Sequence, residues 1–277
     1  MTVERNASRT AEGVALIRAV HQLIDAPPPI LDDPVSLLLV GPERVEAIRR
    51  NPERANRPAA AALRSHVVLR SRYAEDRLRD AVARGVRQYV ALGAGLDTFA
   101  YRQPAWASTL RIFEVDHPAS QASKLAWLAD AGVEVPANVT FVALDLEADP
   151  IGPGIAAAGF DATSPAFISC LGVLAYLAPA TVDAVFAWAA SLAHGTEFVF
   201  TFAQPVSGPE RGTAARAAEL DEPWQTRLEP GEIRERLAEL GYASVAFVEP
   251  VEAAAYFAGR SDALRPPARV SIARAVV

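Results

Sequence analysis

Two glycines that end a short apolar run place the strongest constraint on how this chain folds. Residues 89–92 are apolar and lead into Gly93-Ala94-Gly95; a second apolar run, 110–115, ends in Asp116, 21 positions beyond Gly95. A glycine turn after a buried strand lets a ligand lie against the backbone, and a carboxylate at the next strand end can accept hydrogen bonds from a ribose diol. The spacing therefore predicts a nucleoside-binding α/β unit.

The residues after the second glycine indicate which nucleoside the turn suits. A dinucleotide fingerprint has a third glycine three residues further on, where a pyrophosphate meets a helix N-terminus. Here that position is Thr98, and Asp97 before it puts a negative charge close to where phosphates would lie. S-adenosylmethionine (SAM) has no phosphate and carries an ammonium and a sulfonium group, so the turn favours SAM over NAD. Locally, Asp97 is also expected to cap a helix.

Composition and charge restrict the classes of partner. The net charge is −6 and the pI about 5.4, so no basic field is available for nucleic acid or for anionic lipid. Cys170 is the only cysteine, which excludes an intramolecular disulfide and cysteine-based zinc sites. Residues 1–9 are polar and no apolar run reaches transmembrane length. We expect a cytoplasmic protein with a small-molecule substrate, and the sequence leaves its oligomeric state open.

Alternating strand and helix patterns predict an α/β fold with a mostly parallel sheet and right-handed crossovers. The final strand is expected to pair antiparallel with its neighbours. We expect a helical cap over residues 1–85, a core over 86–277 and a mobile lid near 204–228. The expected helices cover 10–24, 56–84, 119–131, 180–193 and 231–240, with a short helix opening at Asp32-Asp33-Pro34. The expected strands cover 87–92, 109–115, 138–143, 165–171, 196–202, 242–248 and 268–275.

The turn Gly93 to Thr98 and the strand end Glu114 to Pro118, together with further blocks in the same order, resemble the leucine carboxyl methyltransferase family. That family also includes bacterial O-methyltransferases of secondary metabolism, some of which act on polyketides. The resemblance spans roughly residues 8–250, and its most specific part is Gly-Ala-Gly-Leu-Asp-Thr paired with Glu-Val-Asp-x-Pro. The matching blocks are Thr10-Ala11 with Arg18-Ala19, Asp32-Asp33-Pro34, Arg70-Ser71-Arg72-Tyr73, Leu92 to Thr98 with Tyr101-Arg102, Phe113 to Pro118 with Lys124, Asp145-Leu146, and Leu171 to Leu177.

This resemblance implies a class I methyltransferase fold, Rossmann-like, with SAM in the cleft at the carboxyl ends of the strands. By position, Arg70 would hold the methionine carboxylate, with Arg18 as a second candidate, and Asp116 would take the ribose hydroxyls. Asp145-Leu146 would flank the adenine edge. The turn residues Gly93, Ala94 and Gly95 would line the methionine and the ribose.

Other positions carry more than one interpretation. Glu114 is a candidate second ribose ligand, a satisfied strand-end carboxylate or a partner for an arginine. His117 is a candidate base, yet it precedes a proline where a helix starts. Tyr176 is a candidate acceptor contact or a support for the lid. Leu171 occupies a position where many family members have glutamate, so one polar contact near the cofactor or acceptor is missing.

The sequence therefore predicts a SAM-dependent O-methyltransferase of secondary metabolism, with a carboxylate acceptor favoured over a phenol. A carboxylate is already ionised and needs no base, whereas a phenol needs help with deprotonation. The first alternative is a methyltransferase-like protein that binds SAM in a non-methylating or partner role. The second, less favoured, is an NAD-dependent oxidoreductase.

Overall fold

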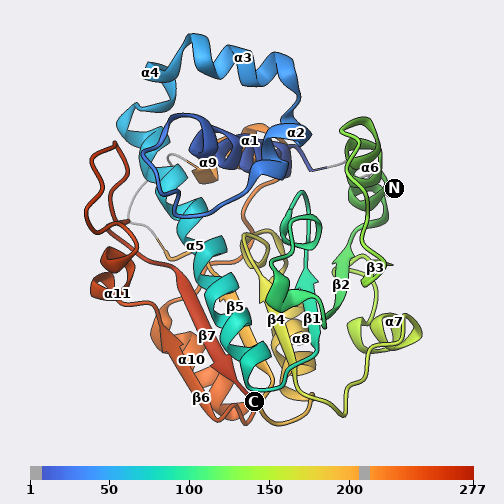
Figure 1. The fold of residues 1–277 in the computed structure, drawn as a ribbon. Coiled ribbons are helices and arrows are strands. Elements are labelled where there is room, and N and C mark those ends of the chain that lie inside the picture. The colour runs from blue at the N-terminus through green and yellow to red at the C-terminus, as the bar shows by residue number, and fades with distance from the viewer. Residues whose placement is uncertain (1–7, 206–212) are drawn as a thin grey trace.

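A seven-stranded sheet forms the centre of the described residues, 8–205 and 213–277, in this computed structural model (Figure 1). Its strand order is β3-β2-β1-β4-β5-β7-β6, with β7 antiparallel to both β5 and β6 and the remaining pairs parallel. The predicted mostly parallel sheet with an antiparallel last strand is confirmed. The strands are β1 (Gln88–Leu92), β2 (Arg111–Asp116), β3 (Val139–Ala143), β4 (Ala166–Cys170), β5 (Glu197–Thr201), β6 (Ser244–Phe247) and β7 (Ile272–Val276).

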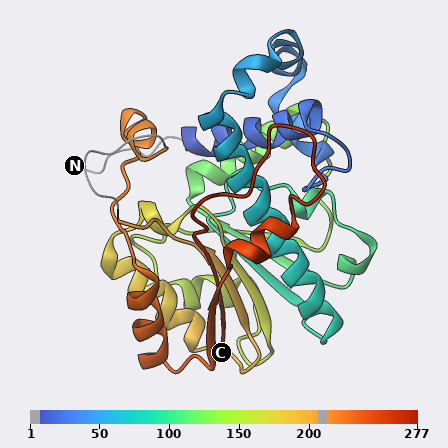
Figure 2. The same cartoon turned by 90° about the vertical axis from the view of Figure 1, so that its left-hand side faces the viewer.

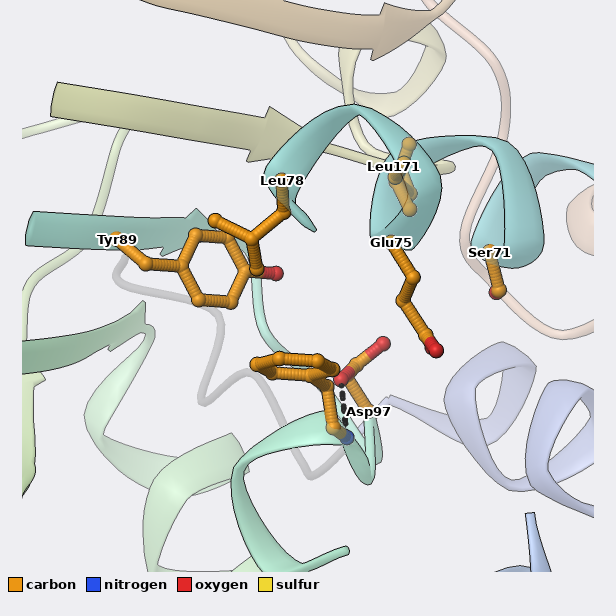
Figure 3. Close-up of a pocket in the computed structure, with 8 residues that line it drawn as sticks. Ser71, Glu75, Leu78, Tyr89, Asp97 and Leu171 are labelled. Atoms are coloured by element: carbon orange, nitrogen blue, oxygen red, sulfur yellow. Dashed lines mark hydrogen bonds between the residues drawn. The ribbon is translucent and has the colours of Figure 1, made fainter. Parts of the chain in front are cut away.

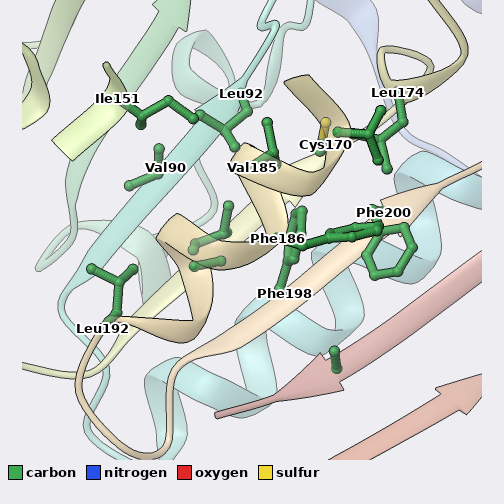
Figure 4. Close-up of a cluster of buried hydrophobic side chains, with 14 of the residues drawn as sticks. Val90, Leu92, Ile151, Cys170, Leu174, Val185, Phe186, Leu192, Phe198 and Phe200 are labelled. Carbon is green, nitrogen blue, oxygen red and sulfur yellow. The ribbon is translucent and has the colours of Figure 1, made fainter. Parts of the chain in front are cut away.

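Helices cover both faces of the sheet, and the side chains of the central strand alternate between them. Val90 and Leu92 point into a cluster shared with helix α8 (Pro179–Ala190). In that helix, Phe186 packs against Phe198 and Phe200 (Figure 4). On the other face, Tyr89 belongs to a cluster shared with helix α5 (Pro58–Ala83). The helices after β2 are α6 (Pro118–Asp130), α7 (Ile151–Ala157), α8 (Pro179–Ala190), α9 (Thr213–Glu219), α10 (Pro230–Glu239) and α11 (Pro250–Ala255). None of the helices in the described ranges has the length and apolar character that a membrane crossing requires.

From residue 8 onward, five helices precede the first strand, and the first four of them gather at one end of the molecule (Figures 1 and 2). The predicted helices over 10–24 and 56–84 and the Asp-Pro helix start correspond to α1, α5 and α2. Asp33 caps α2 by accepting a 3.1 Å hydrogen bond from the amide of Ser36. The five helices are α1 (Arg9–Ile24), α2 (Pro34–Val40), α3 (Pro42–Arg50), α4 (Pro52–Ala55) and α5 (Pro58–Ala83).

The segment predicted as a lid near 204–228 lies partly outside the described residues, because 206–212 are not among them. Its last part is hydrogen-bonded to the turn that follows β4. The amide of Gln225 donates to the carbonyl of Ala175 at 2.7 Å, and the amide of Leu228 donates to the carbonyl of Ala203 at 2.8 Å. Residues 225–228 are therefore fixed against the core.

Candidate functional site

The glycine turn after β1 is shaped by its contact with the turn after β4. Gly93 has φ of +65° and its amide donates to the carbonyl of Val115 at 2.8 Å. A Cβ added at Gly93 would lie 2.4 Å from Cγ2 of Val173, which is shorter than any van der Waals contact. The position therefore requires glycine for two reasons, backbone conformation and space. Ala94, the next residue, is buried.

Asp116 ends β2 with its carboxylate held against this turn. One oxygen accepts from the amide of Gly95 at 2.5 Å, and the other accepts from the amide of His117 at 2.7 Å. Burial raises the pKa of Asp116, and these two amide bonds oppose that rise. A carboxylate oxygen accepts more than one hydrogen bond, so Asp116 keeps acceptor capacity for a ligand in the turn.

Glu114 is fully engaged inside the protein. Its Oε2 lies 2.7 Å from Nζ of Lys124 and accepts a 2.7 Å hydrogen bond from the hydroxyl of Tyr101. Glu114 and Lys124 are 2% and 1% exposed. Of the interpretations left open by the sequence, the structure supports a satisfied carboxylate. Its charge partner is the lysine, so the suggestion of an arginine partner is wrong, and we leave Glu114 out of the ribose site.

Arg70 projects from α5 to the carboxyl end of β4. A Cβ added at Gly172 would lie 2.7 Å from its Nη1, so the guanidinium rests directly on the glycine backbone. Its Nε is buried and has no hydrogen-bond partner among the described residues. Burial and the charge of Arg18 lower the pKa of Arg70 to about 10, while Tyr176 and Asp97 act in the opposite direction. Arg70 therefore stays charged at neutral pH with unused donor capacity.

Arg72 and Arg18, the two other arginines of the sequence argument, have partners. Arg72 pairs with Asp76 at 3.1 Å and its side chain is 39% exposed. Arg18 pairs with Asp33 at 2.8 Å and also donates to the carbonyl of Leu96, so it binds α1 to the glycine turn. Burial alone would raise the pKa of Asp33, but Arg18 and Arg102 outweigh that effect and the pKa is lowered. Arg18 therefore holds α1 against the glycine turn, and Arg70 is the better candidate for binding an anionic ligand.

Asp97 borders a small cavity of about 10 Å³, the space of a single water. Figure 3 shows its carboxylate facing that of Glu75 across this space, with Leu171 on the same wall. Asp97 also accepts from the amide of Phe99 at 2.8 Å, beside the short 3-10 helix η1 (Phe99–Tyr101). The N-cap position of η1 is Thr98 and no side chain caps it, so Asp97 is not the helix cap expected from the sequence. Glu75 is paired with Arg102. The side chain of Leu171 adds no polar atom to the cavity wall. The negative charge of the wall comes from Asp97 and Glu75.

The remaining candidates lie around the same strand ends with mostly local contacts. Asp145 accepts from the amide of Glu147 at 3.0 Å in the turn after β3. Leu146, beside it, packs against the core cluster that contains Phe186. His117 caps α6, because its Nδ1 accepts a hydrogen bond from the amide of Ala119 at 3.2 Å. Of its two interpretations, the structure shows the role at the helix start.

Two residues of this region were not singled out from the sequence as site residues. Gly172 has φ of +78° and supports Arg70. Trp224 meets Tyr176 edge to face, with ring centroids 6.4 Å apart. Tyr176 lies on η3 (Leu174–Tyr176), directly after Gly172 and Val173. The glycine in Leu171-Gly172-Val173 predicts a turn. Nothing near Trp224 in the sequence indicates that it lies beside Tyr176. In residues 8–205 and 213–277, no group of three or more His, Cys, Asp or Glu is placed to hold a metal ion.

The strand order, the antiparallel β7 between β5 and β6, and the glycine turn facing Asp116 define the fold of the class I methyltransferases. Solved structures share this fold. A "putative methyltransferase" from Thermobifida fusca superimposes with a TM-score of 0.58 at 20% identity, covering 95% of this chain and 93% of that one. A DUF574 family protein from Streptomyces avermitilis gives a TM-score of 0.56 at 18% identity, covering 98% and 97%.

The sequence model of the leucine carboxyl methyltransferase family matches residues 11–190, and the chain belongs to that family. The resemblance seen in the motifs is confirmed. A Bacillus subtilis protein named "Putative S-adenosyl-L-methionine-dependent methyltransferase YktD" is 32% identical over 183 residues, 64% of this chain and 59% of that protein. A Mycolicibacterium smegmatis protein of similar name is 31% identical over 223 residues, 78% of this chain and 71% of that protein. A Mycobacterium tuberculosis relative, 36% identical, is matched over only 49% of its length.

Proposed function

We propose that this chain is a SAM-dependent O-methyltransferase of secondary metabolism that acts on a small molecule, with a carboxylate acceptor favoured over a phenol. The observation that carries the proposal is Arg70, a half-buried arginine that rests on Gly172 and whose buried Nε has no partner among the described residues. An uncompensated buried charge is costly, so this position suits an anionic group. The methionine carboxylate of SAM is such a group.

The neighbouring residues fit the rest of SAM. Asp97 lies where a negative charge would meet the ammonium group, and Asp116 would accept from the ribose hydroxyls. Asp145 and Leu146 would flank the adenine, one offering an acceptor and the other an apolar surface. Arg70 at the other end would fix the methionine portion, so the ligand would span the ends of the neighbouring strands β1 to β4.

When bound, SAM supplies a methyl group on a positively charged sulfur. The protein's contribution is to hold the acceptor in line and to exclude water. A carboxylate oxygen of the acceptor would form the new carbon–oxygen bond as the carbon–sulfur bond breaks and its electron pair stays on sulfur. No proton is removed in this step. That agrees with His117, the candidate base, being used as a helix cap.

The cofactor assignment predicts selective stabilisation by S-adenosylhomocysteine. A ligand at a hundredfold excess over its dissociation constant should raise the free energy of unfolding by about 2.7 kcal/mol through mass action. NAD at the same concentration should have no effect, because Asp97 disfavours its phosphates. Thermal unfolding with each ligand checks this. Stabilisation by NAD alone would instead support the oxidoreductase.

The ribose assignment predicts a selective effect of Asp116→Ala. Losing the carboxylate leaves ribose hydroxyls without an acceptor, so S-adenosylhomocysteine should bind about tenfold to a hundredfold more weakly. Asp130→Ala, at the exposed end of α6, is the control and should bind normally. Calorimetric titration of both variants measures the difference. An Asp116→Ala variant that is folded and binds as the wild type would remove Asp116 from the ribose site.

Leu171 favours a second candidate, a protein that binds SAM without transferring its methyl group. It replaces a polar contact with an apolar one beside Asp97 and Glu75. Transfer of isotope-labelled methyl to a panel of carboxylates and phenols separates the two functions. Tight binding of S-adenosylhomocysteine with no labelled product from any acceptor would favour the second candidate.

A further inference from the structure

We propose that Trp224 and Tyr176 form the acceptor subsite, and that the acceptor is an aromatic carboxylate whose oxygen accepts a hydrogen bond from the indole nitrogen of Trp224. This inference rests on the proposed function, because it assigns the acceptor side of the same site. It also commits to one class of acceptor, a flat apolar ring that carries a carboxylate.

The segment before Trp224 is bound to the N-terminus of α1. Glu222 accepts hydrogen bonds from the hydroxyl of Ser8 at 3.0 Å and from the amide of Arg9 at 2.7 Å, and it also contacts Thr10. A carboxylate at a helix N-terminus accepts hydrogen bonds from the free amides and is attracted to the positive end of the helix dipole. The same first turn of α1 lies against the glycine turn, since the Cβ of Ala11 is 3.4 Å from where a Cβ of Gly95 would be.

The segment after Trp224 is bound to the turn that follows β4. The amide of Gln225 donates to the carbonyl of Ala175 at 2.7 Å, and its side chain donates to the carbonyl of Tyr176 at 2.6 Å. The hydroxyl of Thr226 donates to the carbonyl of Leu177 at 2.6 Å. Trp224 is therefore held on one side by the helix over the glycine turn and on the other by the turn that starts next to Arg70.

The Trp224 side chain has an unused donor. Its Nε1 is buried and has no hydrogen-bond partner among the described residues. A buried N–H without an acceptor costs free energy that a ligand oxygen would recover. The ring meets Tyr176 at an interplanar angle of 88°, so the pair offers aromatic surface beside that donor.

Charge near the pair favours an anionic acceptor. The guanidinium carbon of Arg227 lies 5.7 Å from the centre of the Trp224 ring. Arg70 lies close enough to Tyr176 for the tyrosine to act electrostatically on it. Because the methionine carboxylate of the cofactor would neutralise Arg70, Arg227 would supply the positive charge that a carboxylate meets in this subsite, and a cationic acceptor would be repelled.

The test uses benzoate as the probe and the full chain saturated with S-adenosylhomocysteine. The chain has four tryptophans, so a ¹H–¹⁵N spectrum shows at most four indole signals. Trp224→Phe identifies one of them by its loss and keeps an aromatic ring at this position. Benzoate should shift the Trp224 signal downfield in the wild type and bind about tenfold more weakly to Trp224→Phe. Trp188→Phe, in α8, is the matched control and should bind benzoate as the wild type does.

Three outcomes would overturn the inference: no shift of the Trp224 signal with benzoate, equal benzoate affinity in Trp224→Phe, or phenol binding in preference to benzoate. Binding of S-adenosylhomocysteine is measured separately. If the wild type does not bind S-adenosylhomocysteine, the proposed function itself is contradicted. If the wild type binds it and any of the three outcomes is seen, only the acceptor subsite is contradicted. If Trp224→Phe does not fold, the wild-type titration still decides, because contacts to the Tyr176 ring identify the Trp224 signal.

Discussion

Replacing Arg70 by alanine is expected to weaken the binding of S-adenosylhomocysteine by about tenfold to a hundredfold or more. The wild-type guanidinium would form a charge-assisted hydrogen bond with the methionine carboxylate, and such bonds are stronger than neutral ones. Alanine would leave that carboxylate in a buried position without a cation. Isothermal titration calorimetry of the folded variant measures the loss directly.

Arg72→Ala is the matched control for this prediction. Arg72 lies two residues further along α5, rotated by about 200° around the helix axis, and its partner is Asp76 on the same helix. Its loss should change the affinity by less than about twofold, because its side chain is already paired with Asp76 and has no donor assigned to the cofactor. Equal, small effects in both variants would mean that the N-terminal helices take no part in cofactor binding, leaving residues 87–203 to hold SAM alone.

Lys124→Met is expected to lower the free energy of unfolding by about 3–5 kcal/mol, because it leaves the carboxylate of Glu114 buried without a counter-charge. Methionine keeps a similar length and an apolar stem, so the change is mainly electrostatic. Urea unfolding monitored by circular dichroism checks the value. Arg50→Met is the control: its pair with Glu46 spans 2.9 Å on side chains 77% and 49% exposed, and its loss should cost less than about 1 kcal/mol.

The same variant should show a distinct pH dependence. Burial already raises the pKa of Glu114, and Lys124 opposes that rise. Without the lysine, the folded protein would take up a proton on Glu114 at a pH where the unfolded chain does not. A pKa raised in the folded state means that stability is lost as the pH increases. The deficit relative to the wild type should therefore be smaller at pH 5 than at pH 8, and a second change, Glu114→Gln, should also reduce it.

The sheet was predictable because its strands are short apolar runs with clear breaks. The run before Gly93 and the run before Asp116 became adjacent strands, with Leu92 paired to Val115. Such a pattern depends only on neighbours in the chain. The glycine turn and the strand-end carboxylate were found for the same reason, since the order of two adjacent parallel strands fixes their meeting point.

The residues that complete the site could not be predicted in this way. Arg70 and Arg72 look alike in local pattern, and the choice of Arg70 came from the family resemblance. The packing of α5 on the sheet gives the physical reason, because Arg70 rests on Gly172 while Arg72 pairs with Asp76. The roles of Arg18 and Glu114 were set by Asp33 and by Lys124, neither of which is predictable as a partner from spacing.

Two of the helices that were missed, α3 and α11, bury little of their surface. α3 (Pro42–Arg50) has no fully buried residue, and Val45 and Ile48 alone make too short an apolar pattern to detect. α11 (Pro250–Ala255) has only six residues and buries Ala253 alone. Long-range capping was missed for a different reason: Glu222 lies more than two hundred residues from Ser8, and only the fold brings them together.

The burial of the Glu114–Lys124 pair also determines how the lysine of this protein reacts with amine-directed reagents. Lys124 is the only lysine in the sequence, and in the fold it is 1% exposed and bound to a carboxylate. No lysine side chain on the folded surface is therefore available for acylation, for amine-directed cross-linking or for attachment of a dye. A label on Lys124 would require the region around α6 to open first, so its rate of labelling would report that opening.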